Sequence, residues 1–393
     1  MNQDNDLQLL SLPFDTESMI ARLRAWVESE SPSYDANAVN RMTALVATEL
    51  GELGAHVEII PGNGVGDSLR ARLPHAHGAG APGILVMGHL DTVHPENTLA
   101  RLPWRREGGK CYGPGILDMK GGVFLAVEAL RQLQRAGVTT GLPVTFLLTS
   151  DEEIGSPTTR ALIEQEALRH HYILIPEPAR PDGGVVTGRY AIARFNLQAS
   201  GTPSHAGSRP GDGRSAIRVM AEKLIELENM TCADYTFSVG VIEGGKWVNC
   251  VPMDCRAEAL SMARTQNDLD RAIERASSLG FRSDTAAFRV EVSNTRPVWN
   301  TNDATLRLYE LARTEAARLG FELPRQTSGG GSDGNFTGAL GLTTLDGLGP
   351  RGAGMHTLNE HIDESSLVPR ARLLASLLLK LDEPSARNTQ AAA

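Results

Sequence analysis

Residues 85–93 read L-V-M-G-H-L-D-T-V, a short apolar run that ends in a histidine and an aspartate. The run is typical of a buried strand, and we expect this strand to stop at Gly88. Because side chains of an extended chain alternate with a period of two, His89 and Asp91 can point to the same side. The imidazole could then bind a metal ion, with the carboxylate holding its ring or lying just behind it. A histidine at a strand end is more often ordinary surface, so the pair needs further support.

Predicted strands and helices alternate on both sides of this stretch. Apolar side chains at helical spacing predict helices over 15–29 and 37–53, and Gly54 is the expected stop of the second helix. Strands are predicted over 56–60, 69–73, 84–87, 144–149 and 172–175, with helices from about 123 and 158, whereas 96–115 look irregular. This alternation predicts an α/β sheet that is covered by helices on both faces.

Candidate ligands follow the predicted strands. In α/β sheets ligands gather at the carboxyl ends of strands. We place four acidic or imidazole candidates at four such ends, a coincidence that random placement would seldom produce: His89, Asp118, the pair Glu152 and Glu153, and Glu177. Adjacent acids can diverge at a strand exit, one toward a metal ion and the other toward a water molecule, although most such pairs in proteins are solvated turns.

The pattern changes at about residue 188. Over about 100 residues the predicted order is strand, helix, strand, strand, helix, strand, which is the ferredoxin-like order. A chain of 393 residues is expected to form more than one core. We therefore predict a first domain over 1–187 that resumes over 299–383, an inserted ferredoxin-like domain over 188–298, and a disordered tail over 384–393. The second part of the first domain includes a glycine-rich turn at 328–334.

Composition limits the partners and the compartment. The net charge is −9 and no run of lysine and arginine occurs, which argues against a nucleic-acid partner. The four cysteines form no C-x-x-C pair, so we expect reduced thiols in a reducing compartment. No signal peptide is evident, and no segment approaches the about 18 apolar residues of a membrane span. We expect a cytoplasmic protein without a membrane partner.

Five segments in order, G-H-L-D-T-V, G-P-G-I-L-D-M-K-G-G, S-D-E-E-I-G-S, P-E-P and G-M-H-T-L-N-E-H-I-D, resemble the motifs of a known family. It is the di-zinc aminoacylase/carboxypeptidase/dipeptidase/desuccinylase family of metallopeptidases. The resemblance covers about residues 15–383, and T-S-G-G-G-S-D and R-P-V-W-N look closest to the glutamate carboxypeptidase branch. It implies that the first domain is the catalytic one, a zinc-peptidase-like mixed sheet flanked by helices, and that the inserted domain is a dimerisation or lid domain.

The resemblance implies two Zn²⁺ ions per subunit, with Co²⁺ or Mn²⁺ as alternatives. Asp118 would bridge the ions, and the remaining ligands would be His89 with Glu177 on one ion and Glu153 with His356 on the other. His361 is the competitor of His356 for the last position. Zinc takes imidazole nitrogen and carboxylate oxygen as ligands. Two ions about 3.5–4 Å apart can share a hydroxide and polarise a carbonyl oxygen together.

The same resemblance implies roles for residues around the metal ions. Glu152 would be the general base, and Asp91 would orient His89. His205, in S-G-T-P-S-H-A-G-S, would help to stabilise the tetrahedral intermediate, with a simple turn histidine as the alternative. In relatives this histidine reaches the active site of the neighbouring subunit, which implies a homodimer.

Substrate contacts are expected from two further segments. Asn249, in W-V-N-C-V-P, is a candidate by resemblance. Arg296 could bind a substrate carboxylate in a bidentate manner, although a surface arginine is the alternative. The backbone N–H groups of Gly329 and Gly330, and of Gly331 after them, could contact the same carboxylate because glycine lets a main chain approach closely.

The leading hypothesis is a metal-dependent hydrolase that cleaves the amide bond to a C-terminal amino acid, as a glutamate-type carboxypeptidase does. The substrate would be a small peptide or an N-acyl amino acid. An N-acyl amino-acid deacylase or desuccinylase, similar to acetylornithine deacetylase, is the alternative with the same catalytic residues. A non-catalytic binding protein on this fold should lack ligands or the base, and here all six positions are filled.

Overall fold

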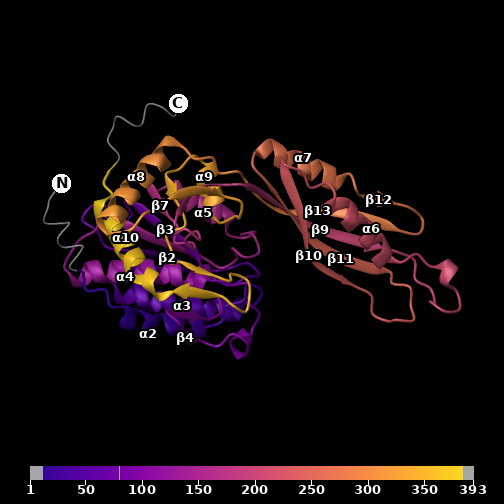
Figure 1. The fold of residues 1–393 in the computed structure, drawn as a ribbon, viewed down its shortest axis with the longest axis horizontal. Coiled ribbons are helices and arrows are strands. Elements are labelled where there is room, and N and C mark those ends of the chain that lie inside the picture. The colour runs from indigo at the N-terminus through magenta and orange to yellow at the C-terminus, as the bar shows by residue number, and fades with distance from the viewer. Residues whose placement is uncertain (1–11, 79, 384–393) are drawn as a thin grey trace. The chain divides into compact units, whose positions relative to one another are not determined.

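The computed structural model describes residues 12–78 and 80–383 (Figure 1). The described chain forms two compact units. The first unit ends at Thr187 and resumes over Asn300–Thr327 and again from Ser332, and the second comprises Gly188–Trp299 and Ser328–Gly331. The turn Ser328–Gly331 lies with the second unit because Tyr190 N donates to Ser328 O at 3.0 Å and Arg189 Nη1 donates to Gly330 O at 2.7 Å. The tail predicted to be disordered, 384–393, lies outside the described residues.

A six-stranded mixed sheet organises the first unit. Its strand order is β1 (His56–Ile60), β2 (Ser68–Arg72), β6 (Val144–Thr149), β3 (Ile84–His89), β7 (Tyr172–Leu174) and β15 (Thr344–Leu345). Strand β3 runs parallel to both β6 and β7, whereas β2 pairs antiparallel with β1 and β6. The predicted α/β class with a mixed sheet is confirmed.

Helices cover both faces of this sheet. They are α2 (Thr16–Glu28), α3 (Ala36–Glu52), α4 (Gly121–Arg135), α5 (Arg160–Ala167), α8 (Asp303–Arg318), α9 (Gly334–Ala339) and α10 (Leu367–Lys380). Along β3, Ile84 and Val86 belong to the main core with α4 and α10, while Leu85 and Met87 belong to a smaller core with α5 and Phe336. Alternate side chains of one strand therefore fill two cores, which explains why β3 is a continuous apolar run.

Gly88 does not end its strand, contrary to the prediction. Strand β3 continues through His89, which pairs in register with Thr149 of β6. A Cβ atom on Gly88 would lie 2.9 Å from the side chains of Met119 and Val123. The glycine is thus needed for close packing against the segment that leads into α4.

Several short strands were not predicted. Residues 96–115 were expected to be irregular, but β4 (Arg105–Glu107) and β5 (Lys110–Tyr112) form a hairpin within a second, four-stranded sheet with β16 (Gly352–Ala353) and β17 (His361–Asp363). Strands β8 (Val185–Arg189) and β14 (Arg325–Ser328) form a separate pair. Strands this short and polar carry no apolar periodicity, so only their tertiary pairing defines them.

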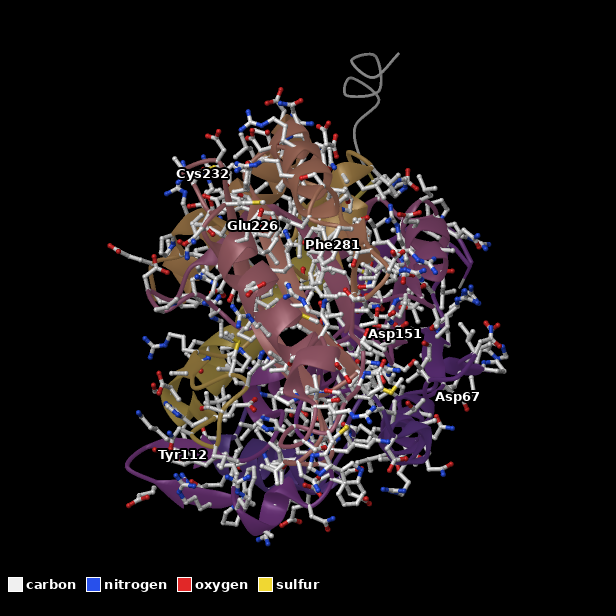
Figure 2. All side chains as sticks on the ribbon, turned by 90° about the vertical axis from the view of Figure 1, so that its right-hand side faces the viewer. Asp67, Tyr112, Asp151, Glu226, Cys232 and Phe281 are labelled. Carbon is white, nitrogen blue, oxygen red and sulfur yellow. The ribbon has the colours of Figure 1, made fainter. Side chains whose placement is uncertain are left out.

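The second unit has the strand and helix order that the sequence indicates. Its elements are β9 (Ala191–Ser200), α6 (Ala216–Glu228), β10 (Tyr235–Gly244), β11 (Asp254–Ala263), α7 (Gln266–Ser277), the short β12 (Phe281–Arg282) and β13 (Ala287–Arg296). The sheet order is β10-β11-β9-β13-β12, and one face of it shares a core with α6 and α7. Figure 2 labels three residues of this unit: Glu226 on α6, Phe281 on β12 and the exposed Cys232.

Two expectations about the whole chain can be compared with the structure. All four cysteines are free in the structure. Within residues 12–78 and 80–383, no helix has the length and apolar character that crossing a membrane requires.

Because Gly122 has no side chain, α4 packs closely against the residues that follow β7. A Cβ atom at this position would overlap the carbonyl oxygen of Pro176, the residue before Glu177. The lack of a side chain therefore lets the first turn of α4 approach the segment that carries one of the candidate ligands.

We predict that Gly122→Ala lowers the free energy of unfolding by about 1–3 kcal/mol or more, because the backbone oxygen that the methyl group meets cannot move aside easily. Gly51→Ala in α3 is the matched control, since nothing lies within 4 Å of its Cβ position. It should be neutral or stabilise the protein by up to about 1 kcal/mol. Urea unfolding followed by circular dichroism measures both changes, and equal stabilities would contradict the prediction.

Candidate metal centre

The candidate ligands of the first unit meet at one edge of the six-stranded sheet. His89 is the last residue of β3, Glu152 and Glu153 follow β6, and Glu177 follows β7. Since β6, β3 and β7 are neighbouring parallel strands, their carboxyl ends lie side by side. This is the position at which open α/β sheets bind ligands.

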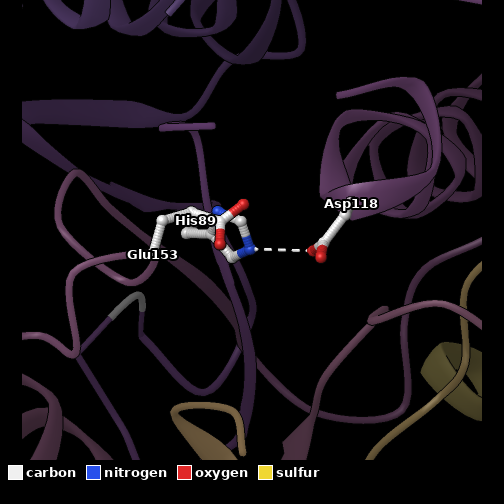
Figure 3. A group of neighbouring side chains, drawn as sticks. All are labelled: His89, Asp118 and Glu153. Carbon is white, nitrogen blue, oxygen red and sulfur yellow. Dashed lines mark hydrogen bonds and ion pairs between the residues drawn. The ribbon is translucent and has the colours of Figure 1, made fainter. Parts of the chain in front are cut away.

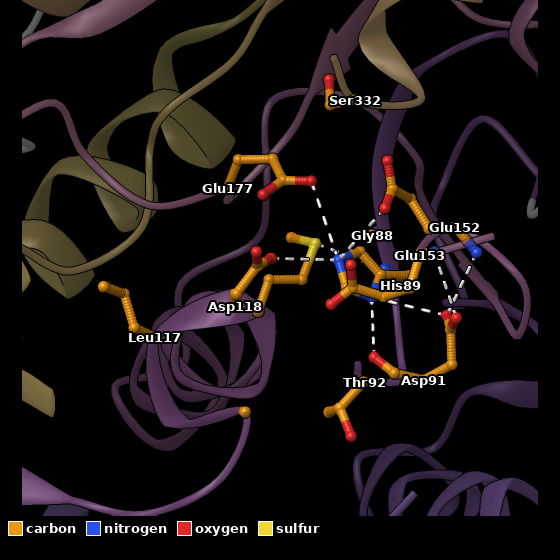
Figure 4. Close-up of polar contacts among 12 residues, drawn as sticks. Gly88, His89, Asp91, Thr92, Leu117, Asp118, Glu152, Glu153, Glu177 and Ser332 are labelled. Carbon is orange, nitrogen blue, oxygen red and sulfur yellow. Dashed lines mark hydrogen bonds and ion pairs between the residues drawn. The ribbon is translucent and has the colours of Figure 1, made fainter. Parts of the chain in front are cut away.

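Asp118 does not follow a strand, contrary to our placement of it. It lies in the loop segment Ile116–Lys120 immediately before α4, where its own backbone angles are not helical. Its carboxylate nevertheless lies beside His89 in the cluster (Figure 4). Asp118 Oδ1 is 3.2 Å from His89 Nε2, and Asp118 Oδ2 is 3.2 Å from His356 Nε2. Each oxygen of one carboxylate therefore faces a different imidazole.

Three glutamates complete the cluster. Glu153 Oε2 lies 3.3 Å from His356 Nε2, while Glu177 Oε1 and Glu152 Oε2 lie 3.8 Å and 4.0 Å from His89 Nε2. Figure 3 shows His89, Asp118 and Glu153, whose candidate ligand atoms all lie within 4.8 Å of one another. His89 thus lies near one oxygen of Asp118 and near Glu177, whereas His356 lies near the other oxygen and near Glu153.

Asp91 holds both the histidine and the glutamate pair. The Nδ1–H of His89 lies 2.9 Å from the main-chain oxygen of Asp91 and 3.5 Å from its carboxylate. The carboxylate itself accepts hydrogen bonds from the backbone N–H groups of Glu152 and Glu153, each at 3.2 Å, and from the hydroxyl of Ser33 at 2.7 Å. Because Nδ1 of His89 donates to the main-chain oxygen of Asp91, Nε2 is the ring nitrogen that would bind a cation once it has lost its proton.

Burial and mutual repulsion set the charges of the cluster. Burial and the nearby Asp118 raise the pKa of Glu153 to about 8, and they raise the pKa of Glu177 well above its usual range. Burial opposes ionisation of Asp118 as well, but hydrogen bonds with His356 and His89 outweigh it and hold the Asp118 pKa below its usual value. Hydrogen bonds with Asp118 and Glu153 raise the pKa of His356 to about 10.

The donor set fits divalent metal ions. It combines imidazole nitrogen with carboxylate oxygen, a combination that zinc accepts and that cobalt and manganese tolerate. Repulsion among Asp118, Glu153 and Glu177 is the kind of interaction that bound divalent cations would offset.

The structure distinguishes between the two histidines near the C-terminal motif. His356, with φ 61°, contacts Asp118 and Glu153. His361 lies on β17, where its Nδ1 is 2.8 Å from Asn359 O and its ring packs against Tyr112. The left-handed backbone at His356 is uncommon for a residue other than glycine, and such conformations cluster at functional sites.

His205 and Asn249 lie on two paired loops of the second unit. The backbone N–H groups of Gly207 and Ser208 donate to His205 Nδ1, each at 3.1 Å. The neutral ring therefore carries its proton on Nε2. The main-chain oxygen of Asn249 accepts from Ala206 N at 3.0 Å, and both candidates line an open cavity of about 500 Å³.

Arg296 and the glycine turn also lie together in the second unit. Arg296 ends β13 and is only 6% exposed. A Cβ atom on Gly331 would lie 2.8 Å from Arg296 Cδ, so the side chain of Arg296 packs directly against this turn. The glycine lets the turn and the arginine approach closely.

Sequence reasoning missed one buried pair beside the cluster. The sequence motifs give His94 no role, but it is buried and its Nε2 lies 2.5 Å from Glu360 Oε2. Glu360 belongs to the same motif as His356, four residues later. In the sequence, the only indication of this pair is that Glu360 is an acidic residue of the motif with no assigned role.

Comparisons with known proteins place the cluster in context. Residues 85–380 match the sequence profile of peptidase family M20/M25/M40. Carboxypeptidase G2 of Pseudomonas sp. (strain RS-16) is 29% identical over 378 residues, which cover 93% of this chain and 89% of that protein. Succinyl-diaminopimelate desuccinylase of Xanthomonas campestris pv. campestris (strain B100) is 26% identical over 357 residues, covering 86% of this chain and 93% of the relative.

A solved structure shows the same fold. Human carnosine dipeptidase 1 superposes with a TM-score of 0.76 over 95% of this chain and 98% of its own, at 17% sequence identity. At this identity the likeness concerns the fold.

Proposed function

This chain belongs to peptidase family M20/M25/M40, a family of metal-dependent hydrolases, and we propose that it is a carboxypeptidase that releases a C-terminal glutamate or a similar amino acid. One observation carries the proposal. The carboxylate of Asp118 presents one oxygen to His89 and the other to His356, each at 3.2 Å. This arrangement is suited to a residue that bridges two cations.

In this proposal the five clustered side chains would hold two divalent ions, zinc first with cobalt or manganese as alternatives. Asp118 would be shared, His89 and Glu177 would serve one ion, and Glu153 and His356 would serve the other. Bound zinc supplies Lewis acidity, which polarises a carbonyl group and acidifies water at neutral pH.

Glu152 is the proposed general base. Asp91 fixes its backbone N–H, its carboxylate reaches to 4.0 Å from His89 Nε2, and its side chain keeps some access to solvent. From this position Glu152 would take a proton from the attacking water and later return it to the leaving amine, which is a step that a positioned carboxylate can perform. His205, with its Nε2 proton exposed, would donate to the oxyanion of the tetrahedral intermediate.

The substrate proposal rests on the relatives and on Arg296. Carboxypeptidase G2 is similar over nearly the whole chain, and Arg296 beside the 329–331 turn suits a free α-carboxylate. Asn249 would provide a further contact with the substrate. The desuccinylase relative favours a second candidate, an N-acyl amino-acid deacylase or desuccinylase, which would use the same catalytic residues.

We also propose that the chain forms a homodimer through the second unit, which would serve as a dimerisation or lid domain. Strand β10 is at the edge of its sheet, and Val241, Ile242 and Trp247 on and after it are exposed. Unpaired edge strands with exposed apolar residues favour association with another chain.

Glu152→Gln should lower kcat by about 100- to 10,000-fold, because an amide cannot accept the proton. Metal content, measured by atomic emission, should stay unchanged. Glu107→Gln, which alters an exposed glutamate paired with Arg105, is the control and should keep full activity. A Glu152→Gln enzyme with its metals and full rate would remove Glu152 from the base role, and full activity after exhaustive chelation would exclude the metal mechanism.

Hydrolysis rates on a panel of substrates distinguish the carboxypeptidase from the deacylase. Rates are compared on N-benzoyl-glutamate, N-succinyl-diaminopimelate, N-acetylornithine and a peptide that ends in glutamate. The carboxypeptidase proposal requires the highest kcat/KM on the substrates that release glutamate. A preference for the succinyl or acetyl substrates would favour the deacylase.

Arg296→Met should raise KM about tenfold or more for substrates with a free α-carboxylate, since a hydrogen bond to a charged group contributes about 1.5–3 kcal/mol. Substrates with an amidated α-carboxyl group should bind the variant and the wild type alike. Arg289→Met, on the exposed face of the same strand, serves as the control. Equal losses on both kinds of substrate would rule out carboxylate recognition by Arg296.

Sedimentation equilibrium of the metal-loaded protein should give twice the chain mass of 42.2 kDa. Trp247→Glu together with Val241→Glu should shift the mass toward that of one chain, because charges would replace exposed apolar contacts. A monomeric wild type at micromolar concentration would overturn the dimer.

A further inference from the structure

Glu360 is an acidic side chain that is only 1% exposed and is not among the proposed ligands. Its carboxylate accepts three backbone hydrogen bonds from the loop that precedes α4. Oε1 accepts from Leu117 N at 2.8 Å and from Asp118 N at 3.0 Å, and Oε2 accepts from Gly115 N at 3.0 Å. The fourth partner is His94, on Oε2. The carboxylate is therefore surrounded by donors on both oxygens.

The backbone of this loop departs from regular helical geometry. Gly115 has φ 69°, and Asp118 departs from helical angles with φ −115° and ψ 97°. Backbone N–H groups at the start of a helix have no partner within the helix and need an acceptor from elsewhere. Each buried N–H group left unpaired costs about 1–3 kcal/mol. Without Glu360 the loop would have to rearrange to pair these groups.

Glu360 also connects the two segments that carry Asp118 and His356. Its own N–H donates to Thr357 O at 3.3 Å, next to His356, and its main-chain oxygen accepts from Gly113 N at 3.4 Å. Its carboxylate then binds the N–H of Asp118 itself. A single residue thus fixes the position of the Asp118 backbone relative to the segment of His356.

We propose that Glu360, supported by His94, is a positioning residue that sets the metal affinity of the cluster by holding Asp118 between His89 and His356. The inference rests on the proposed function, since it takes the cluster to bind divalent cations. Glu360 itself would touch neither metal nor substrate. Groups that orient metal ligands without touching the metal typically contribute about 10- to 100-fold in affinity.

The test compares the zinc affinity of the full-length wild type, Glu360→Gln and Glu364→Gln, measured by competition with a chromogenic chelator. The amide keeps the size of the side chain but has one acceptor oxygen and presents N–H groups to N–H donors. Zinc affinity should fall about 10- to 100-fold in Glu360→Gln. Glu364→Gln is the matched control, because Glu364 pairs with Arg106 at 2.7 Å rather than with the backbone of the loop that carries Asp118. Its zinc affinity should stay within about twofold of wild type.

Thermal unfolding of the metal-free proteins separates positioning from general stability. A folded Glu360→Gln variant that binds zinc as tightly as wild type overturns the proposal, whatever its melting temperature. If Glu360→Gln does not fold, His94→Asn takes its place, since it removes one of the four partners, and an unchanged affinity in that variant overturns the proposal. A wild type that binds no divalent ion overturns the proposed function itself, whereas normal wild-type binding with an unchanged variant overturns only the role of Glu360.

Discussion

The carboxylate of Asp118 is the constraint on which the rest of the first unit depends. Its two oxygens must lie within hydrogen-bond distance of two imidazoles that are 267 positions apart in the sequence, at His89 and His356 (356 − 89 = 267). The parallel strands β3, β6 and β7 end at one edge of the sheet, and the candidate ligands at their ends therefore lie along that edge. The loop before α4 then has to bring Asp118 to that edge, and Gly88 and Gly122 lack the side chains that would keep it and its helix away.

The acidic residues around Asp118 divide according to their hydrogen-bond donors. Asp91 and Glu360 each accept three or more hydrogen bonds, mostly from backbone N–H groups, and so their charge is already compensated by the protein. Glu153 and Glu177 are buried near Asp118, and burial with repulsion raises the pKa of both. Carboxylates such as Asp91 and Glu360 hold the backbone in place. A neighbouring cation would stabilise the charged form of carboxylates such as Glu153 and Glu177. The number of hydrogen bonds that a carboxylate accepts from the protein therefore distinguishes the acids that hold the backbone from the acids that are candidate metal ligands.

The candidate substrate-binding residues of the second unit differ in chemistry from the acidic cluster of the first unit. They are hydrogen-bond donors: the Nε2 proton of His205, the guanidinium of Arg296, and the backbone N–H groups of the 329–331 turn. Donors of this kind suit the anionic parts of an amide substrate, namely its α-carboxylate and the oxyanion that forms during hydrolysis. Carboxypeptidase G2 and succinyl-diaminopimelate desuccinylase, both similar to this chain, have names that indicate different substrates. We infer that the specificity lies in contacts of this kind, since the proposed catalytic residues would serve either reaction.

The sequence by itself determined the elements whose faces are buried. The apolar runs of β3 and β6, the spacing of the main helices and the element order of the second unit follow from local periodicity, because a strand or helix that packs on a core must repeat its apolar residues at a fixed interval. Five ordered motifs were enough to indicate the family. Tertiary structure alone decided that Asp118 reaches the cluster from a loop, that β5 pairs with both β4 and β17, and that His94 binds Glu360 across 266 positions. Such contacts join short polar segments through hydrogen bonds, which leave no periodic pattern in the chain, so they are fixed only when the fold brings the partners together.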